Sequence, residues 1–194
     1  MEAGTQELKL AVDSIYQLTP EAWIDFADLW TVHTVKRKEI MTSAGEHERY
    51  LYFVVEGVQR IFYLDDKDRE ATLVLTYAPS FGGVLDSFLQ QKPSLYYYEA
   101  LTPSRFLRSS WEQVHKCMQR HASVSEMIRK GISQSLSGVL ARMVELQCYS
   151  SEDKFRQLLK RSPHILTLVP HKYLANYLGI DPTNFSKLIN SVRI

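Results

Sequence analysis

Two short helical patterns joined by a glycine lie near the end of the chain, and they constrain its fold more than any other feature. Apolar residues recur at helical spacing before Gly179 and again after it. Gly179 permits the left-handed backbone of a tight turn, Asp181 can cap the second helix, and Pro182 suits its first position, which needs no backbone donor. Residues 169–192 are therefore predicted to form two short helices hinged at Gly179.

Short polar side chains and one cation occupy the remaining face of the second helix, where they can hydrogen-bond to base edges and phosphates. The residues predicted to contact DNA are Pro182, Thr183, Asn184 and Lys187 at the bases, and His171, Lys172, Ser186 and Asn190 at the phosphates. This pattern predicts a helix-turn-helix that enters the major groove of duplex DNA. The alternative is an ordinary helical hairpin with a solvated polar face.

Charge is divided unevenly along the chain. Residues 151–194 hold seven Lys or Arg and three Asp or Glu, a net charge of +4, whereas the rest of the chain carries −3. A positive terminal module suits contact with phosphates, and each neutralised phosphate makes the affinity for DNA depend on salt.

Composition excludes several classes of protein. The chain has no run of about 18 or more apolar residues and no basic-then-apolar start, so we expect a soluble, cytoplasmic protein without a membrane partner. Cys117 and Cys148 are its two cysteines, too few for a disulfide framework or a four-cysteine metal site. We expect both to be small, buried or half-buried apolar groups.

The middle of the chain has the composition of a β domain. A helix is predicted at 20–30, because Thr19, Pro20 and Glu21 form a helix start. Residues 31–110 are rich in β-branched and aromatic residues with frequent turns, which predicts about six strands and a short helix at 85–90. The predicted strands are 32–40, 50–55, 58–64, 71–77, 96–101 and 105–109. Short, closely spaced strands suggest a barrel or sandwich.

Helical patterns return after this β region, at 111–121 and at 123–148. The second is about 39 Å long if wholly helical, and small residues inside it would let another helix approach closely. We interpret it as a two-fold dimer helix whose contact residues are Ile128, Gly131, Ser135, Gly138 and Val139. The alternative is a helix packed wholly on its own β domain. A capped helix is predicted at 154–161, followed at 165–169 by a wing or connecting strand.

Several short sequence segments, taken in their order along the chain, resemble segments of the Crp/Fnr transcription regulators. GIDPTNFSKL at 179–188 is similar to the family's recognition helix, and YFVVEG at 52–57, FGG at 81–83 and EAL at 99–101 resemble parts of its sensor domain. The resemblance implies an α+β fold with an N-terminal double-stranded β-helix (jelly-roll) sensor at 1–121, a dimerisation helix at 122–148 and a winged helix-turn-helix at 149–194. It also implies a homodimer that regulates transcription at a near-palindromic operator, with RNA polymerase as a further partner.

The chain departs from the family at telling positions. Thr183 and Lys187 stand where a glutamate and an arginine are frequent, so base preference cannot be transferred. Gly83 stands where cyclic-nucleotide binders have a ribose-binding glutamate, and the stretch 92–96 lacks their phosphate-binding arginine. We therefore expect no cyclic nucleotide and no cofactor. A pocket for another small-molecule effector is predicted from Phe81, Gly82, Gly83, Ser87, Phe88, Ser94 and Tyr96, with simple core filling as the alternative.

An enzyme is the main rival function, because similar β-folds host cupin-like metal enzymes. Such sites need clustered ligands, yet the six histidines are dispersed and no His-x-His pair occurs. No Walker loop, nucleophile elbow or HExxH sequence is present either. We predict neither a metal site nor an enzyme. A dimeric ligand-binding or protein-interaction scaffold is the third alternative.

Overall fold

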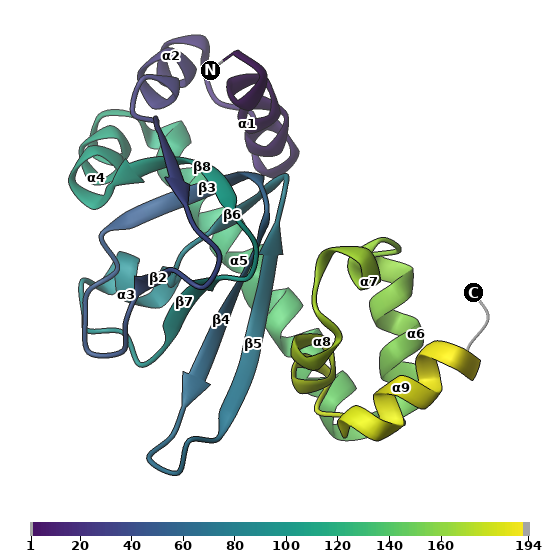
Figure 1. Cartoon of the computed structure of the whole chain (residues 1–194). Coiled ribbons are helices and arrows are strands. Elements are labelled where there is room, and N and C mark those ends of the chain that lie inside the picture. The colour runs from purple at the N-terminus through teal and green to yellow at the C-terminus, as the bar shows by residue number, and fades with distance from the viewer. Residues whose placement is uncertain (1, 192–194) are drawn as a thin grey trace.

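The computed structural model describes residues 2–191, which form a β domain, a long helix and a helical C-terminal unit (Figure 1). The helices are α1 (Glu2–Ile15), α2 (Pro20–Ala27), α3 (Leu85–Gln90), α4 (Trp111–Arg120), α5 (Ala122–Cys148), α6 (Ser151–Arg161), α7 (Ile165–Leu168), α8 (His171–Leu178) and α9 (Pro182–Ser191). The strands are β1 (Thr31–Val35), β2 (Ile40–Thr42), β3 (Tyr50–Glu56), β4 (Val58–Leu64), β5 (Glu70–Tyr77), β6 (Ser80–Gly82), β7 (Tyr97–Ala100) and β8 (Ser104–Ser110). No helix of this described part is long and apolar enough to cross a bilayer.

Two antiparallel four-stranded sheets make up the β domain. Their strand orders are β1-β8-β3-β6 and β2-β7-β4-β5. Eight strands are present where about six were predicted, because β2 and β6 have three residues each and are too short to show alternation. The predicted strand 32–40 is divided at Lys38, whose positive φ of 67° turns the chain between β1 and β2.

Aromatic side chains fill the space between the sheets. Alternation along β3 sends Tyr52 and Val54 inward, where they meet Tyr98 and Phe106, all at most 2% exposed. Ring centroids of Tyr52 lie 5.6 Å from those of Tyr98 and 5.3 Å from those of Phe106. The interior is thus a packed aromatic core.

Helices cover the outer face of β3 and β8. Leu51, Phe53 and Leu107 point outward into a second core built with residues of α1, α2, α4 and the start of α5. The predicted helices at 20–30 and 111–121 are confirmed as α2 and α4. α1 was not predicted, although Leu8 and Val12, both fully buried, stand one helical turn apart.

α5 confirms the predicted long helix and runs from the β domain to the C-terminal unit (Figure 1). Val124 and Met127 near its start are buried in the second core. Large apolar residues farther along it are exposed: Ile132, Leu136, Val139, Leu140, Met143, Val144 and Leu146. The helix therefore does not pack wholly on its own β domain. Cys117 is buried as expected, but Cys148 is exposed, because α5 has left the core where it ends.

The C-terminal unit packs α6 to α9 around a third core that includes Phe155, Leu174 and Phe185. The strand predicted at 165–169 is wrong, since α7 forms there. Ile165 and Val169 are 1% and 2% exposed, and one turn of helix directs both of them into the third core. Residues 149–191 contain no strand, and the expected wing is therefore absent from this part of the chain.

Candidate functional site

The helix-turn-helix predicted from the sequence forms between α8 and α9. Gly179 ends α8 with a left-handed φ of 61°, and its amide donates to the carbonyls of Ala175 and Asn176. Asp181 then caps α9, because its Oδ1 accepts from the amides of Thr183 at 2.9 Å and Asn184 at 3.3 Å. Pro182 is the first residue of α9, as predicted.

One face of α9 anchors the helix and the other is open. Phe185 and Leu188 are 1% and 8% exposed, and the ring of Phe185 meets that of Phe155 edge-on at 5.5 Å. The residues predicted to contact DNA are all exposed: His171, Lys172, Pro182, Thr183, Asn184, Ser186, Lys187 and Asn190. The structure therefore presents these side chains on the surface of a helix that its apolar face holds in place.

The start of α8 lies beside α9. The His171 ring lies 5.9 Å from the ring of Phe185, and Lys172 Nζ lies 4.6 Å from the ring centre of Tyr173. Both polar groups are thus exposed next to the α9 face, where two successive helices can contact phosphates and bases together.

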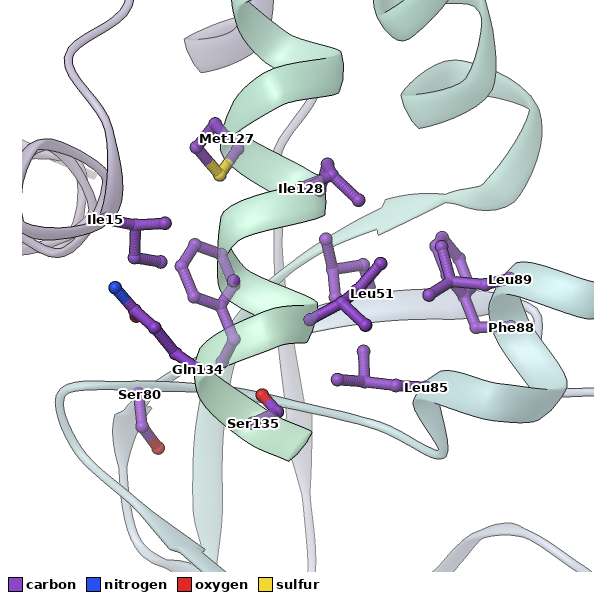
Figure 2. Close-up of a pocket in the computed structure, with 13 residues that line it drawn as sticks. Ile15, Leu51, Ser80, Leu85, Phe88, Leu89, Met127, Ile128, Gln134 and Ser135 are labelled. Atoms are coloured by element: carbon purple, nitrogen blue, oxygen red, sulfur yellow. The ribbon is translucent and has the colours of Figure 1, made fainter. Parts of the chain in front are cut away.

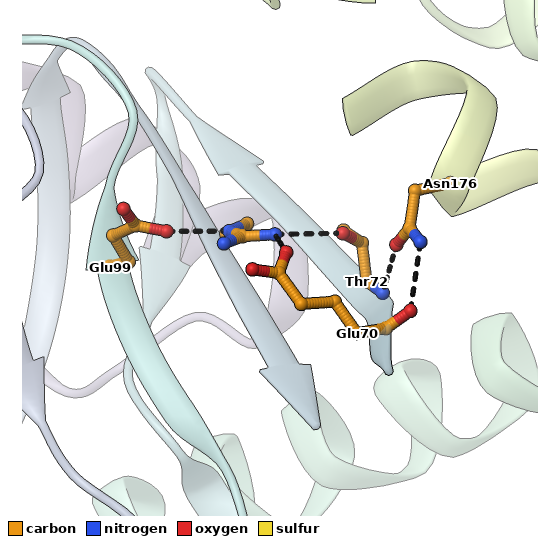
Figure 3. A network of polar contacts seen from close by, with 5 residues as sticks. Glu70, Thr72, Glu99 and Asn176 are labelled. Atoms are coloured by element: carbon orange, nitrogen blue, oxygen red, sulfur yellow. Dashed lines mark hydrogen bonds and ion pairs between the residues drawn. The ribbon is translucent and has the colours of Figure 1, made fainter. Parts of the chain in front are cut away.

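The edge strand β5 binds the helix-turn-helix through one amide group (Figure 3). Asn176 Oδ1 accepts from the Thr72 amide at 2.6 Å, and its Nδ2 donates to the Glu70 carbonyl at 2.9 Å. The Asn176 side chain therefore pairs with β5 much as a neighbouring strand would. The Tyr77 hydroxyl also hydrogen-bonds to the Ser162 hydroxyl near the end of α6.

Arg60 supports this contact from within the sheet. Its Nε lies 2.6 Å from Glu99 and its Nη1 2.6 Å from Glu70, and its guanidinium lies 4.4 Å from the ring centre of Tyr173 on α8. Burial alone would lower the pKa of Arg60, but hydrogen bonds to the two carboxylates outweigh burial and raise it. A buried, charged guanidinium thus connects both strands of the β4–β5 hairpin to the C-terminal unit.

The end of α5 holds the same unit from its other side. Arg142 lies 4.0 Å from the ring centre of Tyr177, and Arg161 Nη2 donates to Glu145 at 3.0 Å. α5 and the hairpin therefore each connect the β domain to the unit that carries α8 and α9.

Side chains pack closely around Gly82 and Gly83 inside the β domain. A Cβ added at Gly82 would collide with the hydroxyl of Tyr98, which is fully buried. Gly83 has a φ of +105°, and a Cβ there would lie 3.2 Å from the Tyr50 carbonyl oxygen. A glutamate at position 83 would therefore be strained as well as crowded.

Glu48 places a carboxylate of the protein itself in this region. Its Oε2 accepts from the Thr42 hydroxyl at 2.8 Å and the Val84 amide at 3.1 Å, and its Oε1 accepts from the Tyr50 amide at 3.2 Å. Burial raises the pKa of Glu48, although these hydrogen bonds oppose the rise. An incoming phosphate would have to compete with this anion for the Val84 donor.

The residues predicted to form an effector pocket are divided between several surroundings. Gly82 and Gly83 touch the aromatic core. Ser87 binds the Glu48 amide at 3.0 Å and the Lys92 carbonyl at 2.6 Å, while the Ser94 hydroxyl bonds within its own turn near the half-buried Tyr96. Phe81 and Phe88 instead line a cavity outside the sheets, against α5 (Figure 2). The seven residues thus share no single pocket, because strand alternation and structural hydrogen bonds direct them to different sides.

The residues predicted for the dimer helix also separate. Ile128 and Gly131 line that cavity, Ser135 lies at its border, and Gly138 and Val139 are exposed. A stripe that the sequence analysis did not single out has heptad spacing on the exposed side of α5: Ile132, Leu136, Val139, Met143 and Leu146. The sequence contains the signal, since these apolar residues are spaced alternately by four and three.

Metal chemistry finds no support in the described residues. Across positions 2–191, no three or more His, Cys, Asp or Glu residues gather so that they could hold a metal ion. Of the histidines of the β domain, His33 lies on β1 and His47 forms an isolated bridge with Pro93.

Comparison with known proteins agrees with this architecture. Residues 32–121 match the family model of the cyclic nucleotide-binding domain. The global nitrogen regulator of Synechocystis sp. is 26% identical over 106 residues, which cover 54% of this chain and 47% of the relative. The chain is similar to these regulators over part of its length. It spans about half the length of the curated relatives that it matches, and those relatives are regulators rather than enzymes.

Solved Crp/Fnr-type structures share the fold at low sequence identity. FixK2 from Bradyrhizobium japonicum has a TM-score of 0.76 at 15% identity, covering 83% of each chain. A Crp/Fnr family transcriptional regulator from Eubacterium rectale has a TM-score of 0.69 at 18% identity, covering 89% of this chain and 82% of its own. The α+β arrangement of β domain, long helix and helical C-terminal region is therefore a fold that this chain shares with these regulators.

Proposed function

We propose that the protein is a homodimeric, sequence-specific DNA-binding regulator of transcription. The observation that carries this proposal is the exposed polar face of α9, with Thr183, Asn184 and Lys187 on a helix that Asp181 caps and Phe185 anchors. Asparagine can read adenine, lysine can read guanine, and a rigid helix brings both to the major groove in one register. His171 and Lys172 then contact phosphates.

Dimerisation follows from the apolar stripe along α5. Side chains of the stripe are between 41% and 57% exposed in the single chain, which is costly for five large apolar groups in water. Pairing of two α5 helices would bury them with coiled-coil spacing and relate the two α9 helices by a two-fold axis. Such a dimer reads a near-palindrome with half-sites about one helical turn apart.

The β domain has a regulatory role without cyclic nucleotide. Tyr98 packs against Gly82, Glu48 already accepts from the Val84 amide, and the side chain of Lys92 is exposed. A buried phosphate without a fixed cation is unfavourable. Calorimetric titration with cyclic AMP should show no binding, and micromolar affinity would contradict this part of the proposal.

Selection of bound fragments from random duplex DNA tests the function directly. The purified full chain should enrich a near-palindromic sequence in dilute salt. Lys187→Ala should lose much of this enrichment, whereas Lys116→Ala, which removes the same charge from the exposed surface of α4, should keep it. Failure of the unaltered chain to enrich any sequence would refute the proposal.

A further inference from the structure

A cavity of about 270 Å³ lies between the β domain and α5, outside the two sheets (Figure 2). α1 contributes Ile15, β3 contributes Leu51, and α3 contributes Leu85 and Leu89. Met127 and its neighbours on α5 close the opposite side. Ligand pockets occur at such junctions of structural units, and this volume suits a compact molecule.

The walls of the cavity define the chemistry of a ligand. Most lining side chains are aliphatic or aromatic, and no residue described along its walls carries a charge. Its polar side chains are neutral: Ser80, Gln134 and Ser135, which lie together toward one end in Figure 2. An anion such as a nucleotide would find no counter-charge here, whereas an apolar molecule with one hydrogen-bonding group would match both ends.

Gly131 is a second, independent sign that the space is meant to be filled. A Cβ at this position would meet only Ile15, at 3.8 and 3.9 Å, which are ordinary contact distances. The chain's own packing therefore does not require glycine here, although glycine inside a helix costs about 1 kcal/mol relative to alanine. Glycine at position 131 therefore leaves space beside the cavity that a larger side chain would occupy.

We propose that this cavity binds a small neutral molecule with an apolar body and a single hydrogen-bonding group. Binding itself is independent of the function proposed above, while the molecule's role as the effector rests on that function. The interior of the sheets is filled by Tyr52 and Tyr98, so a ligand finds its space beside α5. There it touches Ile128 and Gly131 directly, on the helix that leads to the DNA-binding unit.

The same location explains how occupancy would be transmitted. Ile132 lines the cavity and also begins the exposed apolar stripe of α5. A ligand wedged between α3 and α5 would change the position of α5 against the β domain. It would thereby change the geometry of both the dimer contact and α9.

Fluorescence titration with N-phenyl-1-naphthylamine, a neutral apolar probe with one N–H group, tests the site on the full chain. We expect saturable binding of one probe per chain. Gly131→Leu should weaken it by about tenfold or more, since added methylenes occupy the ligand's place. Ser133→Leu is the matched control on the same helix, because Ser133 is exposed and does not line the cavity, and it should bind as the unaltered chain does.

A second blocking variant and a DNA-binding measurement complete the test of the cavity. Should Gly131→Leu fail to fold, Ser135→Phe at the exposed border of the cavity should block the probe instead. The inference would be overturned if the probe does not saturate the protein or if the blocking variant binds it equally well. It would also be overturned if the probe binds only after the dimer is diluted to monomer, because the partner's helix would then occupy the cavity. Binding of duplex DNA is measured on the same samples. If the protein binds DNA but not the probe, only the proposed ligand cavity is refuted. If it binds the probe but not DNA, only the proposal of a DNA-binding regulator is refuted.

Discussion

Replacing Asn176 by alanine should release the helix-turn-helix from the edge of the β domain. Both polar atoms of the Asn176 side chain are used, one accepting from the Thr72 amide at 2.6 Å and the other donating to the Glu70 carbonyl at 2.9 Å. Because Asn176 is exposed, water can replace it in the variant. The loss is therefore the net value of two hydrogen bonds rather than the penalty of leaving buried groups unpaired.

The magnitude follows from the number of bonds. Two bonds at about 0.5 to 1 kcal/mol each give roughly 1 to 2 kcal/mol. That free energy corresponds to an increase of about 5- to 30-fold in the population in which β5 and α8 are separated. Buried contacts of Tyr173 with Arg60 remain in the variant, so the unit should loosen without unfolding.

Native-state hydrogen exchange measures this local opening. The Thr72 amide has Asn176 as its acceptor, so its exchange in Asn176→Ala should accelerate by the factor given above. Asn184→Ala is the matched control, since Asn184 is also exposed but lies on the outer face of α9. Unchanged protection of Thr72 in Asn176→Ala, or equal acceleration in the control, would refute the reasoning.

Three further predictions address the DNA-binding helix and the β domain. Lys187→Ala should weaken specific binding by about 1 to 3 kcal/mol, whereas Lys172→Ala should weaken all duplexes alike and reduce the salt slope by about one unit; equal behaviour in anisotropy titrations would contradict these roles. Asp181→Ala should destabilise the C-terminal unit by about 1 kcal/mol in urea unfolding, whereas Asp181→Asn keeps the cap and should not. Burial raises the pKa of Glu48 above 4.5, so its contribution to stability is complete below pH 4.5 and is lost as pH rises through its folded pKa. The stability of the protein relative to Glu48→Gln should therefore decline over that range, and a rise would show that the sign is wrong.

Local signals in the sequence predicted the DNA-binding end well. Gly179, Asp181 and Pro182 each favour one backbone conformation at one position, and the structure has all three. The polar face of α9 could also be predicted, because periodicity separates it from the buried Phe185 and Leu188. Whether that face reads DNA stays a prediction.

Features that depend on distant contacts were missed. Ile165 and Val169 suggested a strand by their β-branched side chains, yet a helical turn forms there and both residues are buried in the third core. Asn176 gave no sign in the sequence that it would bind β5, more than 100 residues away. The predicted effector residues were divided because Phe81 and Gly82, as neighbours on β6, face opposite sides of the sheet, and only tertiary packing gives each side its surroundings.

Site-specific photo-crosslinking tests the central claim most directly. In a Cys148→Ser background, which removes the exposed native thiol and leaves the buried Cys117, a photoreactive group is attached at Asn184→Cys or at Lys116→Cys. With the duplex recovered by selection, the account predicts crosslinks from position 184 to bases within each half-site and none from position 116. Crosslinks absent at position 184 while the duplex stays bound, or equally frequent at both positions, would contradict the claim that α9 reads DNA.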